Sequence, residues 1–329
     1  SGSLVFDPGS GKTMTVNTNN GQFTGPCTIA SGVVKMDGNN RCLGQWNMNR
    51  LILVKSGATL DINGVTGGEQ AHSYRVTLEE GANFVNNGAN IGDRKFIITS
   101  GLTLQGDATI SAVEGSVIGG ACHYNIYQSP INLGTYTLTK TGKGAMYYSS
   151  PVISGTGTIN VQAGTFELAH TYWGEEPTFN DGTLKIAEGA GLNLISYNGN
   201  TSFTVKNLVM NGSATFPAES VLTVNGALSG MGTLPRVTLG TDAVLKLDGK
   251  GALTLAGALT LAEGDTLALD LSDINLTKTT AIPVIKVTDA ANMPAEGTFT
   301  GIPAKWNLVK SSDGTSLKLT KPSFTISVR

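Results

Sequence analysis

The chain has 329 residues, of which 43 are glycine and only 14% are charged, and its formal net charge is -2 at pH 7. Its lysines and arginines form no basic stripe, which argues against a nucleic-acid partner, and no apolar run is long enough for a membrane-spanning helix. Hydrophobic residues make up 40%, which is enough for a core, and the low charge is typical of an uncharged secreted surface.

Residues 9–13, with the sequence Gly-Ser-Gly-Lys-Thr, look at first like a phosphate-binding loop. That loop requires a glycine five positions before Gly11, where Phe6 stands, and a helix after the lysine. Residues 14–17, Met-Thr-Val-Asn, favour a strand instead. The segment is therefore interpreted as a turn between two strands.

The three cysteines leave two alternatives open. Cys27 and Cys42 are close enough in sequence for one loop-closing disulfide in an oxidising compartment, or all three cysteines are small buried thiols. Cys122 and His123 are adjacent, but His72 and His170, the other histidines, stand at no ligand spacing from them. We expect no metal site and no other cofactor.

Short runs of Val, Ile, Leu and Thr, many of them alternating with polar residues, predict strands along the whole chain. Clear examples are residues 51–54, 74–78, 158–161 and 244–247. One stretch, residues 289–296, is expected to make a turn of helix.

A turn motif, a glycine followed by a small residue and a strand, recurs along the chain. Its glycines stand at positions 57, 81 and 106 and then at 164, 189 and 212, so the steps are 24, 25, 25 and 23 residues. A period of 20–30 residues without helices is typical of a β-solenoid, in which one coil cannot bury its inward face alone. The prediction is an all-β fold, a single-stranded right-handed parallel β-helix.

Residues 138–144, Leu-Thr-Lys-Thr-Gly-Lys-Gly, and residues 153–166, which end in Ala-Gly-Thr-Phe, form the most distinctive segment. It resembles the autotransporter-associated β-strand repeat of bacterial surface β-helices. Ala145 and Met146 replace the usual Thr-Leu of that repeat, and Phe166 replaces its final Leu. Residues 297–308 and 317–319 look like the segment that closes such passenger helices. The resemblance implies a secreted or surface-displayed bacterial β-helix and no particular activity.

One loop interrupts the rhythm of strands and concentrates aromatic and acidic side chains, a combination that suits sugar recognition. Its candidate glycan-binding residues are His170, Tyr172, Trp173, Glu175 and Glu176. Adjacent acids in an extended chain point apart, so Glu175 and Glu176 make a poor catalytic pair. A loop that packs Trp173 over a strand edge and leaves the acids solvated explains the same residues.

The chain is expected to divide into a solenoid, residues 1–280, and a C-terminal β cap or closing segment, residues 281–329. Its last run, Ser-Phe-Thr-Ile-Ser-Val at 323–328, alternates cleanly and either caps the chain's own solenoid or adds a strand to a neighbouring copy. The candidate assembly residues are Phe324, Ile326 and Val328.

Together these patterns favour a non-enzymatic structural or adhesive protein of the bacterial cell surface, with self-association through the solenoid ends as an expected interaction. The alternative is a carbohydrate-binding or polysaccharide-degrading β-helix protein, because this fold hosts both classes.

Overall fold

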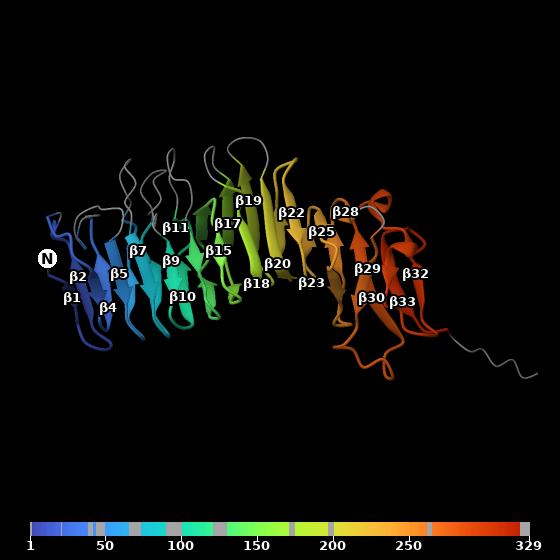
Figure 1. Cartoon of the computed structure of the whole chain (residues 1–329), viewed down its shortest axis with the longest axis horizontal. Helices are drawn as coiled ribbons and strands as arrows, with labels where there is room; N and C mark the ends of the chain where they lie inside the picture. The colour runs from blue at the N-terminus through green and yellow to red at the C-terminus, as the bar shows by residue number, and fades with distance from the viewer. Residues whose placement is uncertain are drawn as a thin grey trace, which may run out of the picture.

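The computed structural model describes residues 2–20, 22–38, 42–43, 50–65, 74–89, 101–120, 130–170, 175–196, 201–261 and 265–322. The chain forms an elongated rod whose strands run across its long axis (Figure 1). β1 and β2 lie at one end of the rod, and β32 and β33 lie at the other. The predicted fold class is confirmed, because consecutive coils stack in parallel sheets as a β-solenoid.

The first sheet has seven strands, in the order β1 (Leu4–Phe6), β3 (Cys27–Ile29), β5 (Arg50–Val54), β7 (Tyr74–Leu78), β9 (Leu102–Leu104), β12 (Ile131–Asn132) and β15 (Ile153–Ser154). The second sheet has 16 strands, and its main file is β2 (Thr13–Val16), β4 (Val33–Met36), β6 (Thr59–Asp61), β8 (Asn83–Asn86), β10 (Ala108–Ala112), β13 (Thr137–Thr141), β16 (Thr158–Val161), β18 (Thr178–Ile186), β20 (Ser202–Met210), β23 (Ala227–Ser229), β26 (Val244–Lys246), β29 (Leu267–Asp270) and β31 (Phe299–Thr300).

The same sheet has a side branch. The first half of β20 pairs with β22 (Val221–Val224), which pairs with β25 (Val237–Leu239), which in turn pairs with β28 (Leu259–Leu261). The third sheet has ten strands, in the order β11 (Val117–Gly120), β14 (Ala145–Ser149), β17 (Thr165–His170), β19 (Gly191–Ser196), β21 (Ser213–Thr215), β24 (Thr233–Leu234), β27 (Leu253–Leu255), β30 (Ala281–Val287), β33 (Ser316–Thr320) and β32 (Asn307–Lys310). There are two 3-10 helices in this part of the chain. η1 (Ala290–Asn292) lies within residues 289–296, where a helical turn is expected from the sequence, and η2 (Glu296–Thr298) begins at the last of those residues.

The two runs of turn glycines correspond to two different corners of the coil. Gly57 and Gly81 precede second-sheet strands, whereas Gly164 and Gly189 precede third-sheet strands. All four have positive φ angles between 68° and 76°, which side chains rarely adopt. The period seen in the sequence is therefore the repeat of each corner from one coil to the next.

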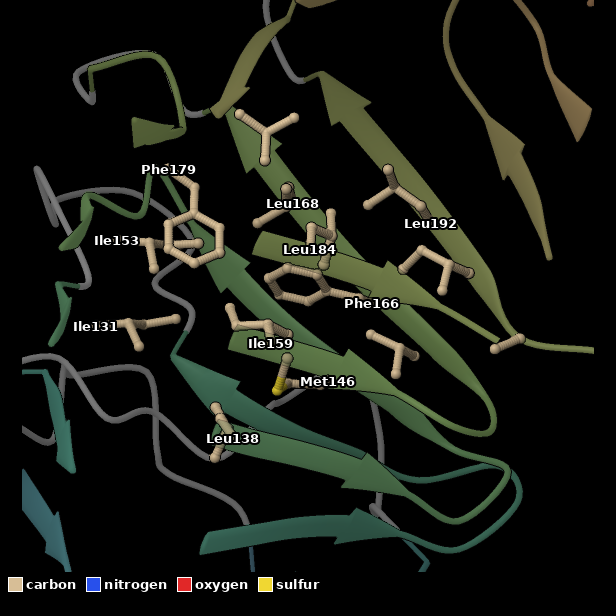
Figure 2. Close-up of a cluster of buried hydrophobic side chains, with 14 of the residues drawn as sticks. Ile131, Leu138, Met146, Ile153, Ile159, Phe166, Leu168, Phe179, Leu184 and Leu192 are labelled. Atoms are coloured by element: carbon tan, nitrogen blue, oxygen red, sulfur yellow. The ribbon is translucent and has the colours of Figure 1, made fainter. Parts of the chain in front are cut away.

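The core consists of files of inward side chains that run along the rod. In the second sheet, register pairing places one such file in the order Met14, Val34, Leu60, Phe84, Ile110, Lys140, Val161, Ile186 and Met210. Figure 2 shows the interior near its middle, where Phe166 from the third sheet lies among Met146, Ile159 and Leu184. Because each file is shared by successive coils, every inner coil is stabilised by both of its neighbours.

At the C-terminal end of the rod, the third sheet finishes in antiparallel pairing, and an aromatic ring packs against the core. β30 is parallel to β27 but antiparallel to β33, which in turn is antiparallel to β32. Trp306 is buried against the core, and the ammonium of Lys321 lies 5.2 Å from the centre of its ring. Lys321 also donates from its backbone N–H to the carbonyl of Thr280 at 3.1 Å. Parallel stacking therefore stops in the third sheet at this end.

Candidate functional site

The predicted glycan-binding loop begins at the end of β17, and the structure brings two of its five residues together. His170 Nδ1 lies 3.5 Å from Glu176 Oε1, and Glu176 Oε2 accepts the backbone N–H of Ser202 at 2.7 Å. Glu175 is exposed, and Tyr172 and Trp173 lie outside the described residues. Both carboxylate oxygens of Glu176 thus hold the base of the loop against the start of β20.

This arrangement gives Glu176 a structural partner on each oxygen, which is the bonding expected of a loop anchor. Glu175 is the neighbouring acid, and it projects into solvent. Hydrolysis of a glycosidic bond needs two carboxyl groups that face one another across the bond. The described residues of the loop therefore provide an anchored base and one solvated acid, and they do not bring two acids to face each other.

The two cysteines near the N-terminus are buried thiols in the first coils. Cys27 belongs to an inward file of the first sheet, between Leu4 and Ile52, and Cys42 is also fully buried. Burial raises the pKa of each thiol to about 12. A thiol with such a pKa is a poor nucleophile and a poor metal ligand near neutral pH. The structure holds both as thiols, and a disulfide between them stays a prediction.

Arg50 lies near the thiol of Cys27 and is 3% exposed. Its Nη1 donates to the carbonyl of Phe23 at 3.0 Å, and its guanidinium carbon lies 4.9 Å from the centre of the Phe23 ring. Nε and Nη2 have no hydrogen-bond partner within the described part of the chain. Burial lowers the pKa of Arg50. The guanidinium is thus held by one carbonyl and one aromatic face.

Lys140 is a fully buried charged residue in the second-sheet file of otherwise apolar side chains. Its Nζ donates to three backbone carbonyls at the corner that follows β13, those of Thr141 at 2.8 Å, Gly142 at 2.8 Å and Ala163 at 3.0 Å. Ala163 belongs to the next coil, so the lysine ties two neighbouring corners together. Its stem meanwhile fills the apolar file between Ile110 and Val161.

Replacing this lysine by methionine tests the role of the three bonds. Lys140→Met keeps an apolar stem of similar length but leaves three carbonyls without their donor, so we expect a loss of about 2 kcal/mol in the free energy of unfolding. Denaturant unfolding followed by circular dichroism measures it. Lys143→Met is the matched control, because the Lys143 side chain is 78% exposed and its loss should change stability by less than about 0.5 kcal/mol. Equal effects of the two substitutions would contradict the assignment.

The same lysine predicts a rise in stability with pH. Burial lowers the pKa of Lys140 to about 8, whereas in the unfolded chain an ordinary lysine titrates near ~10.4. Between these values the folded state binds fewer protons than the unfolded state, so its stability increases with pH. The free energy of unfolding of the wild type, relative to Lys140→Met, should therefore grow as the pH is raised from about 8 to about 10. A flat or falling difference would show that the lysine stays charged in the fold.

The sequence analysis included Lys140 only as a member of the motif at 138–144, and it did not single out Arg50. The signal for Lys140 was present, because the residue stands two places after Leu138 on the same strand face and before Gly142. Alternation alone predicts that such a residue points inward. Arg50 carried no such signal, since it begins its strand and its carbonyl partner, Phe23, belongs to the preceding coil.

In the parts of the chain that are described, no three His, Cys, Asp or Glu side chains gather where they could hold a metal ion. The helices within those same parts are too short to span a membrane.

Comparisons with protein-family models, with curated proteins and with solved structures find no match to this chain.

Proposed function

We propose that this chain is a non-enzymatic structural and adhesive segment of a bacterial surface protein, in which a rigid β-solenoid rod holds other parts away from the cell. The observation that carries the proposal is the continuity of one buried core from Val16 in β2 to Leu319 in β33. Its supports are the low charge of the chain and the resemblance of residues 138–166 to the repeat of surface β-helices.

We expect the pairing of the strands to make the rod stiff. Each coil is bonded to the next through two or three parallel ladders on different faces, so bending the rod requires ladders on one face to lengthen. The shared core resists the same motion, because displaced side chains lose close-packed neighbours on both sides. A rod built in this way holds a fixed distance between its two ends, which a flexible linker cannot do.

Surface display tests the proposal. The chain is placed between an outer-membrane anchor and a terminal epitope, and a second version lacks whole coils of the solenoid. We expect the epitope to be accessible to antibody on intact cells, the rod to resist added protease, and the epitope to lie closer to the membrane in the shortened version by about 4.8 Å per deleted coil. Degradation on the cell, or an epitope distance that does not change with coil number, would contradict the proposal.

Carbohydrate binding is the second candidate, and the observation that favours it is the anchored base of the loop after β17. A glycan array separates the two functions, with Trp173→Ala as the test variant and Tyr136→Ala as a control at an exposed aromatic residue outside the loop. Retention of a glycan by the wild type and its loss in Trp173→Ala alone would assign adhesion to this loop. Release of shorter sugars from a bound polysaccharide would contradict the non-enzymatic role.

A further inference from the structure

One part of the outward face of the second sheet consists almost entirely of hydroxyl side chains. It is formed by eight partly exposed residues of β10, β13, β16 and β18, which we call the threonine face: Thr109, Ser111, Thr137, Thr139, Thr141, Thr158, Asn160 and Thr183. None of the eight carries a charge. Thr109, Thr139 and Asn160 are direct neighbours in one file, although 30 and 21 residues separate them in the sequence. The length of each coil therefore hides this face in the sequence.

The threonine face is a regular lattice, because the strands that carry it pair without a break in register. Neighbours within a file, such as Thr137 and Thr158, lie about 4.8 Å apart along the rod. Neighbours on one strand, such as Thr137 and Thr139, lie about 6.6 Å apart, since each residue of a parallel strand advances about 3.3 Å. The register shift of β18 falls between Phe179 and Thr183, before the face begins. Hydroxyl groups therefore repeat at fixed spacings in two directions.

The layer beneath the threonine face holds this lattice in place. Leu138, Ile159 and Leu184, the inward residues of three of its strands, are fully buried in the core. The ammonium of Lys140 binds carbonyls at the corners after β13 and β16, so these two strands are also tied together at their ends. Threonine is β-branched and has few rotamers on a strand. The face therefore has little conformational freedom to lose when it contacts another ordered surface.

The hydroxyl groups of the face are available to a partner. Within the described part of the chain, one side-chain hydrogen bond reaches a hydroxyl of the face, from Asn207 Nδ2 to Thr183 Oγ1 at 3.4 Å. A hydroxyl both donates and accepts hydrogen bonds, as a water molecule does, whereas a carboxylate ion only accepts them and an ammonium group only donates them. Each hydroxyl can therefore take the place of a water molecule in a hydrogen-bonded lattice.

The composition of the face fits ice better than it fits a protein or a sugar. Protein partners are usually anchored by aromatic and arginine side chains, and aromatic rings also supply the flat apolar faces that suit sugar recognition. The eight residues of the threonine face include no such side chain. Its two spacings are close to the oxygen repeats on the surface of an ice crystal. A rigid, uncharged and repeating surface thus matches a solid that repeats in the same way.

We propose that the threonine face binds ice, with its hydroxyl groups taking the positions of water molecules at the crystal surface. The proposal rests on the adhesive part of the proposed function and names crystalline water as its target. A single hydroxyl gains little from such a contact, because it exchanges one water partner for another. On a rigid lattice all the contacts form together and need no further ordering, so their small contributions add.

Partition into growing ice tests the proposal with the purified chain. Ice is grown slowly on a cooled probe, and the protein content of the ice is compared with that of the remaining liquid. We expect the wild type to enter the ice and to slow ice recrystallisation in a frozen sucrose solution. Thr139→Lys should abolish both effects, because a long charged side chain at the centre of the face holds the crystal away.

Thr103→Lys is the matched control, because Thr103 is a partly exposed outward residue of the first sheet. Its strand, β9, has three residues and presents one outward position, so no second file of hydroxyl groups lies beside it. The two variants carry the same added charge, and Thr103→Lys should enter ice like the wild type. Unchanged circular dichroism and melting temperature in both variants show that the rod remains folded.

Self-association is measured in the same samples. The candidate assembly residues, Phe324, Ile326 and Val328, lie outside the described residues, and assembly through the solenoid ends stays a prediction. Light scattering should give the same mass for the wild type and for both variants. A loss of ice binding in Thr139→Lys at unchanged mass then belongs to the face itself.

Three results would overturn the proposal. The first is exclusion of the wild type from ice to the same extent as an unrelated soluble protein. The second is an equal loss in Thr139→Lys and Thr103→Lys. The third is exclusion from ice combined with retention on crystalline cellulose that Thr139→Lys removes, which would assign the face to a polysaccharide. The surface-display result is independent of all three, so the rod function can stand while ice binding fails.

Discussion

Phe166→Ala is expected to destabilise the chain by about 4 kcal/mol. Phe166 is fully buried in β17, and its register neighbours on the two adjacent strands are Met146 and Leu192. Its ring fills the interior between the sheets (Figure 2). The loss combines the transfer free energy of the ring with the cavity left between three coils.

Two control substitutions should cost much less stability than Phe166→Ala. Phe166→Leu restores the residue that the resembled repeat carries at this position, and it should cost less than about 1.5 kcal/mol because most of the volume is retained. Glu167→Ala removes the next side chain, which faces outward, and should change stability by less than about 0.5 kcal/mol. Denaturant unfolding of the three variants measures the series, and equal losses in all three would contradict the inward placement of Phe166.

Gly164→Ala is expected to cost about 3 kcal/mol or more, for two separable reasons. Gly164 has a φ of 68°, and an added Cβ would lie 2.2 Å from the carbonyl oxygen of Gly144 in the preceding coil. Gly189 occupies the same corner one coil later with a φ of 76°, and a Cβ there would meet nothing within 4 Å.

Gly189→Ala therefore carries the backbone cost alone and should lose only about 1 to 2 kcal/mol. The difference between the two alanine variants, measured by denaturant unfolding, reports the close approach of successive corners. Equal losses would mean that the corners stack less closely than the structure describes.

The fold could be predicted largely from the sequence because its strongest signals are local and repeat with every coil. Alternating strands such as 74–78 and 158–161 were predicted with the bounds that the structure has. The turn glycines gave the coil length, although their division into two corners became apparent only when the sheets were known. Each corner requires the same backbone geometry in every coil, so the same residue type recurs there.

The chemistry of individual side chains could not be predicted in the same way, because it depends on partners from other coils. Glu176 looked like a candidate for sugar recognition, yet one of its oxygens lies 3.5 Å from His170 Nδ1 and the other accepts the N–H of Ser202. Lys140 was noted only as part of the segment that resembles a known repeat, yet its ammonium binds carbonyls inside the rod. In a solenoid, residues in contact are separated by the length of a coil, and that length varies with each loop.

The stacking of coils in register is the central claim, and distances between paired spin labels test it most directly. Asn83, Lys185 and Ser229 belong to one outward file of the second sheet, in which Lys185 lies four strands and Ser229 six strands beyond Asn83. Labels are attached to cysteines at these positions in a chain whose three native cysteines are replaced by alanine. We expect about 19 Å between positions 83 and 185 and about 29 Å between positions 83 and 229. Distances that do not increase with the number of intervening strands would contradict the solenoid.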